Sequence, residues 1–141
     1  MKIEEIESWL AAQPVTVSRM DAAALGKALT AWDNAFASEV KRQTGSWIHE
    51  RFRWHSFSYG FHHALEGEAA LQQYTAQWAA DFVVFDEAAT WCLSCSAERY
   101  PDLTPLRHDL YVAHHNMKWT MAFTHEQPNI GPFFAVGNAE A

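Results

Sequence analysis

The first hydrophobic residues of the chain are spaced as on one face of an α-helix. Ile3, Ile6 and Leu10 recur every three or four residues, which is the period of a helix with one buried side. Three glutamates stand in the first turn, where the positive end of the helix dipole favours them. Because Pro14 cannot continue the hydrogen bonding of a helix interior, we expect a short helix that ends at Gln13.

A longer apolar stripe predicts a second helix. Ser18 and Asp21 are both acceptable N-terminal caps. Gly45 suits a left-handed C-terminal cap, with basic residues in the turn before it. The stripe consists of Leu25, Ala28, Leu29, Trp32, Ala35, Phe36 and Val40. Residues 1–45 are therefore predicted to form two N-terminal helices.

From residue 51 the period changes to two, as in a β-strand. Phe52 and Trp54 alternate with polar residues, and the apolar positions then shift by one to Phe57 and Tyr59. Such a change of phase predicts either a β-bulge near residues 55–56 or a strand that is buried on both faces.

The next segments predict one more helix and two strands. Residues 67–80 carry a third helical stripe, and residues 82–85 form an unbroken apolar run, which is typical of a central strand. Residues 90–95 predict a weaker strand. The two prolines that follow it predict an irregular connection.

The last third of the chain predicts a β-hairpin and a final strand. The runs 109–115 and 119–125 alternate between apolar and polar residues on either side of a short turn. A register with Val112 opposite Met121 makes one face apolar throughout, whereas a shifted register matches side-chain sizes less well. Residues 133–136 predict one more strand.

Together these elements predict an α+β fold with two N-terminal helices followed by a mostly antiparallel sheet of about five strands with one intervening helix. We expect the helices to cover one face of the sheet. The expected single domain covers residues 1–141, with a helical part at 1–45, a sheet-forming part at 51–136 and a frayed tail at 137–141. The 141 residues, of which 49% are hydrophobic and 19% charged, fit one globular domain and exclude a disordered or coiled-coil chain.

The charge restricts the partners of the chain. Its 17 acidic and 10 basic side chains give a net charge of −7, which disfavours nucleic acid and anionic membranes because phosphates require a basic surface. Residues 71–141 hold eight acids and three bases, a net charge of −5. We therefore expect a cationic partner to be attracted to the second half; an acidic surface that only keeps the protein soluble is the alternative.

The sequence also predicts a cytoplasmic location. The N-terminal residues are polar and acidic, whereas a secretory signal has a basic start and an apolar run. No stretch approaches the ~18 apolar residues that span a bilayer. The two cysteines lie in one Cys-Leu-Ser-Cys segment, so they cannot staple distant parts of the fold as in secreted disulfide-rich domains.

Eight histidines and the two nearby cysteines raise the question of a metal site. Cys92 and Cys95 could supply two thiolates to zinc, with His108 or His115 as a further ligand. The second ligand pair of a zinc signature is missing, and the residues after Cys95 do not form the helix that a redox dithiol needs. We predict no metal and no cofactor, with these four residues as the candidates if a metal is bound.

A histidine beside a glutamate closes the second strand of the hairpin. His125 and Glu126 could form an acid–base pair if both project into a cleft with His55 or Tyr59. In the alternative interpretation, this is a strand end at which the side chains of Thr124 and Glu126 bond the backbone of the following turn.

Five short segments form a recognisable pattern over residues 52–136. They are Trp54-His55-Ser56-Phe57-Ser58, Glu66-Gly67-Glu68-Ala69, Trp119-Thr120, Thr124-His125-Glu126 and Gly131-Pro132-Phe133-Phe134. In these segments the chain resembles a family of small bacterial proteins of unknown function. The resemblance implies a cytoplasmic bacterial α+β domain and no particular activity. It also implies that one connected set is formed by Trp54, His55, Trp119, Thr124, His125 and Glu126.

Two functions remain open on the sequence. The first is a non-catalytic protein-binding module, for example of the immunity or antitoxin type, whose acidic half complements a basic effector. The binding candidates for this function are Trp54, Tyr59, Trp119 and Thr124. The second is a small hydrolase-like or metal-dependent enzyme built around His55, His125 and Glu126. The oligomeric state is not predicted.

Overall fold

The computed structural model of this chain describes residues 1–45 and 52–138. Within these ranges the chain is an α+β protein with five α-helices and one short 3-10 helix. The helices are α1 (Ile3–Ala12), α2 (Ala22–Phe36), α3 (Ser38–Thr44), α4 (His55–Ser58), α5 (Glu68–Thr75) and η1 (Thr104–Leu106). None of the described helices is long and apolar enough to cross a membrane.

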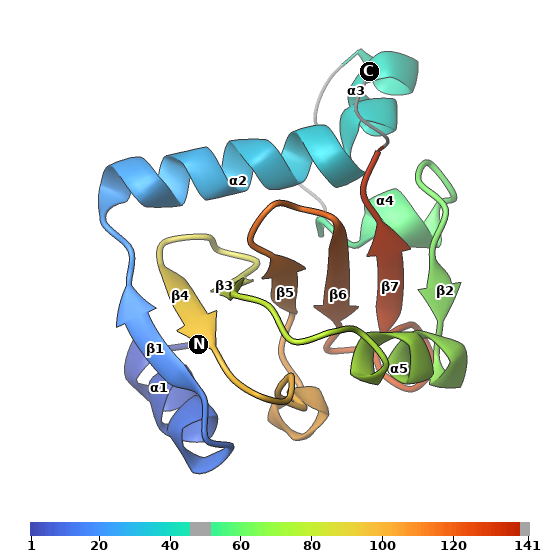
Figure 1. The fold of residues 1–141 in the computed structure, drawn as a ribbon. Coiled ribbons are helices and arrows are strands. Elements are labelled where there is room, and N and C mark those ends of the chain that lie inside the picture. The colour runs from blue at the N-terminus through green and yellow to red at the C-terminus, as the bar shows by residue number, and fades with distance from the viewer. Residues whose placement is uncertain (46–51, 139–141) are drawn as a thin grey trace.

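The described strands form one antiparallel sheet of seven strands in the order β1-β4-β3-β5-β6-β7-β2 (Figure 1). They are β1 (Thr16–Arg19), β2 (Leu65–Glu66), β3 (Phe82–Asp86), β4 (Cys92–Ser96), β5 (Leu110–His114), β6 (Trp119–Phe123) and β7 (Phe133–Val136). The five strands in the middle of the sheet are all ones that the pattern predicts. The two edge strands, β1 and β2, are additions that it missed.

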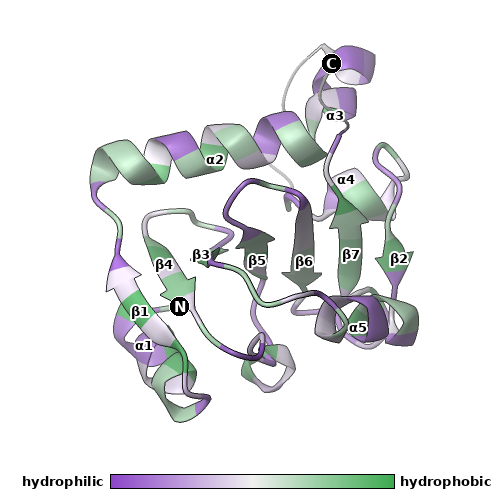
Figure 2. Cartoon of the chain, viewed as in Figure 1, coloured by the Kyte–Doolittle hydropathy of each residue, from purple (hydrophilic) through white to green (hydrophobic). Residues whose placement is uncertain are grey.

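Helices cover both faces of the sheet, so the expectation that they cover one face is wrong. α1 and α5 pack against one face, around Val84, Val112 and Met121. α2 and α4 pack against the other, around Phe85 and Tyr111. Every residue of β3, β5 and β6 is buried, and Figure 2 shows the hydrophobic colours gathered on the middle strands. Strands buried on both faces need a layer of helices on each side.

The predicted second helix is two helices with a break at Ala37. Its ends are as expected: Asp21 caps α2 by accepting from Ala24 N at 2.8 Å, and Gly45 closes α3 in the left-handed conformation. At the break, the Phe36 carbonyl accepts from the Ser56 hydroxyl at 2.6 Å. Carbonyl groups at the end of α2 are thus bonded by distant segments, which ends the regular helix there.

The strand predicted from residue 51 is a helical turn instead. Residue 51 lies outside the described residues, and the next residues lead into α4. Here Phe52 and Trp54 accept backbone hydrogen bonds from His55 and Phe57. The two buried residues Trp54 and Phe57 are three positions apart, which is a helical spacing. The alternation of apolar and polar residues from Phe52 onward partly hides this spacing.

The other predicted elements differ only at their ends. α5 ends at Thr75 and not near residue 80. The hairpin register is confirmed, with Val112 opposite Met121. The predicted frayed tail begins too early, because Gly137 N donates to the Lys118 carbonyl at 2.9 Å and Asn138 N donates to Ala35 at 3.0 Å; residues 139–141 lie outside the described residues.

Trp32 links α2 to the sheet. Its side chain is wholly buried and its indole N–H donates to the Thr120 hydroxyl at 3.0 Å, which in turn donates to the Val112 carbonyl at 2.9 Å. The ring packs edge-on against Phe85 and Tyr111, with centroids 6.3 and 5.3 Å away. Trp32 therefore contributes both apolar burial and a hydrogen bond to one helix–sheet contact.

We predict that Trp32→Ala lowers the free energy of unfolding by about 4 kcal/mol, because a large cavity remains in the core. Trp32→Phe should cost about 1–2 kcal/mol, since it loses the hydrogen bond but keeps an aromatic ring. The matched control is Trp78→Ala, at a side chain that is 93% exposed, and its effect should stay within about 0.5 kcal/mol. Urea unfolding measures all three; equal effects at Trp32 and Trp78 would contradict this account of the core.

Candidate functional site

A cleft beside α4 brings together most of the residues that the sequence selected. Its volume is about 520 Å³, within the usual range of binding sites for small groups. We call it the aromatic cleft. The residues that line it are Phe52, Trp54, His55, Ser58, Tyr59, Glu66, Glu126, Ile130 and Phe133. Trp54 and Phe133 also belong to the core cluster on the α2 side, which places the cleft on that face of the sheet.

Aromatic rings make the walls of the aromatic cleft. Phe52 stacks on Trp54 with centroids 5.3 Å apart and rings 4° from parallel, and Trp54 in turn stacks on Phe133 at 6.1 Å. Tyr59 is 53% exposed and its ring lies 4.6 Å from that of His55. Trp54 and Phe133 are each only 2% exposed, so Tyr59 and the half-buried Phe52 supply the accessible aromatic surface of these walls. The faces of aromatic rings carry negative partial charge and attract cations.

A carboxylate–histidine pair lies at the rim of the cleft. Both oxygens of Asp109 are within hydrogen-bond distance of His125 Nδ1, at 2.8 and 2.9 Å. The same carboxylate accepts from the His125 backbone N–H at 3.0 Å and from the Trp54 indole N–H at 2.9 Å. An ionised carboxylate only accepts, so Nδ1 carries a hydrogen. His125 Nε2 is 3.9 Å from Glu126 Oε1.

Thr124 shapes the loop that presents His125 and Glu126. It is 2% exposed, its hydroxyl donates to the Ile130 carbonyl, and the same oxygen accepts from Glu126 N at 3.3 Å. The loop closes at Gly131, where φ is 82° and a Cβ would come within 2.8 Å of Thr124. The Thr-His-Glu segment therefore has a positioning residue followed by His125, which packs against the lining residue Phe52, and Glu126, which lines the cleft.

A buried polar network holds the floor of the cleft to the sheet. The Tyr111 hydroxyl accepts from Trp54 N at 3.0 Å and donates to Glu87 Oε1. Glu87 also accepts from Arg53 N at 2.9 Å, and the Arg53 side chain lies near both Glu87 and Asp33, at 3.5 and 3.6 Å. Burial raises the pKa of Glu87 to about 7, although the Tyr111 hydrogen bond and Arg53 act in the opposite direction.

The structure divides the predicted site residues between two places. His55, Glu126, Trp54 and Tyr59 line the aromatic cleft, and His125 joins them at the rim through the Phe52 ring, 4.9 Å from its own. The imidazole of His55 is 5.7 Å from the same Phe52 ring, between ring centroids. Trp119 lies elsewhere, in the core cluster on the opposite face of the sheet.

The cysteine and histidine candidates do not converge. Cys92 belongs to the core on the α2 side and Cys95 to the core on the α1 side, because residues three apart on a strand point to opposite faces. Burial raises the pKa of each thiol to about 12. His108 and His115 are exposed. Within residues 1–45 and 52–138, no group of three or more potential ligands is arranged to hold a metal ion.

Sequence reasoning missed three acidic residues of the site: Glu66, which lines the cleft, Asp109 and Glu87. Asp109 could have been found, because the confirmed hairpin register pairs Leu110 with Phe123 and so places the residue before Leu110 next to the start of the Thr-His-Glu segment. Glu87 carried no such signal. It follows β3 at a turn, and only the three-dimensional fold brings it under Tyr111.

Comparison with protein families shows a match to a domain of unknown function (DUF4275) over residues 4–134. No curated protein and no solved structure matches the chain. The candidate site between residues 52 and 133 lies inside the matched region.

The raised pKa of Glu87 predicts a pH dependence of stability. Between its ordinary value of 4.5 and about 7, the folded protein keeps a proton that the unfolded chain releases. Stability therefore falls over this range as the pH rises and is level above it. Glutamine does not ionise, so the Glu87→Gln variant lacks this pH-dependent contribution to the free energy of unfolding. The free energy of unfolding of the wild type minus that of the variant should therefore fall by up to about 3 kcal/mol between pH 5 and 8.

Urea unfolding of both proteins across that range measures the difference, and it isolates Glu87 because every other titratable side chain is the same in both. Glu98→Gln, at an exposed glutamate, is the matched control and should follow the wild type. Parallel curves for the wild type and Glu87→Gln would contradict the raised pKa.

Proposed function

Because the chain belongs to the DUF4275 family, a domain of unknown function, we propose a function from its own site: it is a non-catalytic protein-binding module. The aromatic cleft receives a lysine or arginine side chain of a basic partner. The observation that carries this proposal is the combination of aromatic side chains with two exposed carboxylates, those of Glu66 and Glu126, in the lining of the cleft.

The chemistry of the lining supports a cationic guest. Glu66 and Glu126 are both exposed and line the cleft beside the rings, so a cation there would meet carboxylate charge and aromatic faces together. Among the described residues that line the cleft, none is lysine or arginine. The guanidinium of Arg53, which stands between the lining residues Phe52 and Trp54 in the sequence, lies against Glu87 and Asp33.

The charge of the whole chain supports the same partner. A net charge of −7, of which −5 falls on residues 71–141, would steer a basic protein toward this surface. An immunity or antitoxin protein that neutralises a basic effector is the class of module that fits best. A bacterial cytoplasm is the setting that we propose, because free, buried cysteines suit a reducing compartment.

The first test is an NMR titration with Nα-acetyl-lysine methylamide as the probe. We expect chemical-shift changes at the aromatic cleft, and we expect the Nε-acetylated probe, which lacks the charge, to bind much more weakly. Tyr59→Ala and the double variant Glu66→Gln/Glu126→Gln should each weaken binding about three- to tenfold. In Glu66→Gln the side chain keeps an oxygen that can accept the hydrogen bond from Gly131 N, which is 3.0 Å long with Glu66. The substitution therefore removes the charge without removing this bond.

Glu5→Gln, at an exposed glutamate of α1, is the matched control and should bind like the wild type. Equal binding of the charged and neutral probes, or an equal loss in Glu5→Gln and in the double variant, would contradict the proposal. The first result would show that binding does not depend on the positive charge of the probe. The second would show that the carboxylates of this cleft do not recognise that charge.

The Asp109–His125 pair favours a second candidate function, acid–base catalysis. Asp109 is hydrogen-bonded to Nδ1 of His125. Nε2 is therefore the nitrogen of His125 that would accept or donate a proton in catalysis. Glu126 and His55 would assist from the lining of the cleft. This is the arrangement that a small hydrolase-like enzyme would use.

For this second function we predict that His125→Gln abolishes any hydrolysis of a test ester such as p-nitrophenyl acetate that exceeds the rate of free imidazole. His115→Gln, at an exposed histidine outside the cleft, should leave that rate unchanged. Equal rates in the two variants would exclude a catalytic role for His125 while leaving the binding function untouched.

A further inference from the structure

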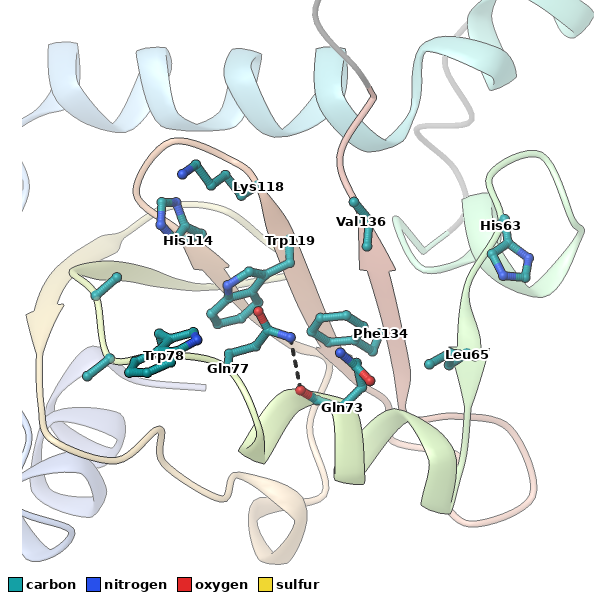
Figure 3. A pocket seen from close by; sticks show the side chains of 12 residues that line it. His63, Leu65, Gln73, Gln77, Trp78, His114, Lys118, Trp119, Phe134 and Val136 are labelled. Carbon is teal, nitrogen blue, oxygen red and sulfur yellow. Dashed lines mark hydrogen bonds between the residues drawn. The ribbon is translucent and has the colours of Figure 1, made fainter.

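A second hollow lies on the opposite face of the sheet from the aromatic cleft (Figure 3). Trp119 and Phe134 lie at its base, where they are only 4% and 2% exposed. Their rings stack with centroids 5.8 Å apart, and both belong to the core cluster on the α1 side. The residues after α5, including Trp78, line one side of it, and Leu65 and Val136 line the other. Its volume is about 500 Å³. We call it the Trp78 hollow.

Exposed apolar side chains gather at this hollow. In the described part of the chain, four large hydrophobic residues are exposed: Tyr59, Leu65, Trp78 and Val136. All but Tyr59 line the Trp78 hollow. An apolar patch around a concave surface is typical of a binding site and is unfavourable in water without a ligand.

The most exposed of these side chains stands on an anchored stretch of backbone. Trp78 is 93% exposed, yet its backbone carbonyl accepts from the Tyr100 hydroxyl at 2.6 Å. The neighbouring Gln77 amide donates to the Gln73 carbonyl at 3.1 Å, as the dashed line in Figure 3 shows. The indole is therefore presented at the side of the hollow by an anchored segment.

The charge of the hollow is opposite to that of the chain. Although the sequence has 17 acidic residues, no carboxylate is among the described residues that line the hollow, and Lys118 stands at its end. His114 also lines it; its Nδ1 accepts from Asn116 N at 3.0 Å, and burial lowers its pKa. Together with His63, these residues line a hollow in which Lys118 is the one lysine or arginine among the described lining residues.

We propose that the Trp78 hollow binds a small aromatic carboxylate. The flat ring of the ligand packs against the exposed indole of Trp78, because aromatic rings favour stacked or edge-to-face contacts. It also covers the small exposed parts of Trp119 and Phe134, which are 4% and 2% exposed. The carboxylate points to Lys118, with which it forms a charge-assisted hydrogen bond. This site is separate from the aromatic cleft, and the two ligands have opposite charge.

The test is an NMR titration of the full chain with indole-3-acetate, followed at the indole N–H signals of Trp78 and Trp119. We expect both signals to shift. Trp78→Ala should weaken binding about tenfold, and Lys118→Gln about three- to tenfold. Indole-3-acetamide, which has the ring without the charge, should bind the wild type as weakly as indole-3-acetate binds Lys118→Gln.

Two matched controls separate this site from the other. Tyr59→Ala removes the exposed aromatic residue of the aromatic cleft and should leave indole-3-acetate binding unchanged, and so should Lys27→Gln, at an exposed lysine of α2. If only the lysine probe shifts the protein signals, the proposal for the Trp78 hollow is wrong. If only indole-3-acetate does so, the proposal for the aromatic cleft is wrong.

Three results would overturn the proposal. The first is the absence of any shift at Trp78 and Trp119 with millimolar indole-3-acetate. The second is equal binding of the acid and the amide, which would remove the role of Lys118. The third is a shift of these signals on dilution without ligand, which would show that a second copy of the chain covers the hollow instead.

Discussion

The buried hydroxyl of Tyr111 is the contact on which the aromatic cleft depends. Tyr111 is wholly buried on β5, and a buried hydroxyl without partners costs about 1–3 kcal/mol. It finds them in the Trp54 amide and the Glu87 carboxylate. These bonds hold the turn before α4 against the sheet, so the walls of the cleft are set by the core and not by a loose surface loop.

Asp109 extends this constraint from the core to the surface. Its carboxylate receives the indole N–H of Trp54 and both the backbone and the ring of His125. The chain segments around residues 54 and 125 are distant in sequence, yet one acidic side chain orients both. A site preorganised in this way spends little conformational freedom on binding, which suits the capture of a long and flexible lysine or arginine side chain.

The sequence predicted the elements whose period is plain and missed those that depend on distant partners. The stripe around Trp32 and the apolar run that became β3 were correct because burial alone explains their spacing. The strand expected near Trp54 was wrong because the bond to Tyr111 favours a helical turn. Of the candidate site, His55, His125 and Glu126 were found from local spacing. Glu87 could not be found in that way, because its role exists only where β3 and β5 meet.

The central claim is that the aromatic cleft takes the side chain of a cationic residue. Intermolecular nuclear Overhauser effects between the protein and a lysine-containing peptide test this claim most directly. We expect contacts from the lysine side-chain methylene protons to the rings of Phe52 and Tyr59, which line the cleft. Contacts at saturation that involve other surfaces and leave these two rings untouched would contradict it.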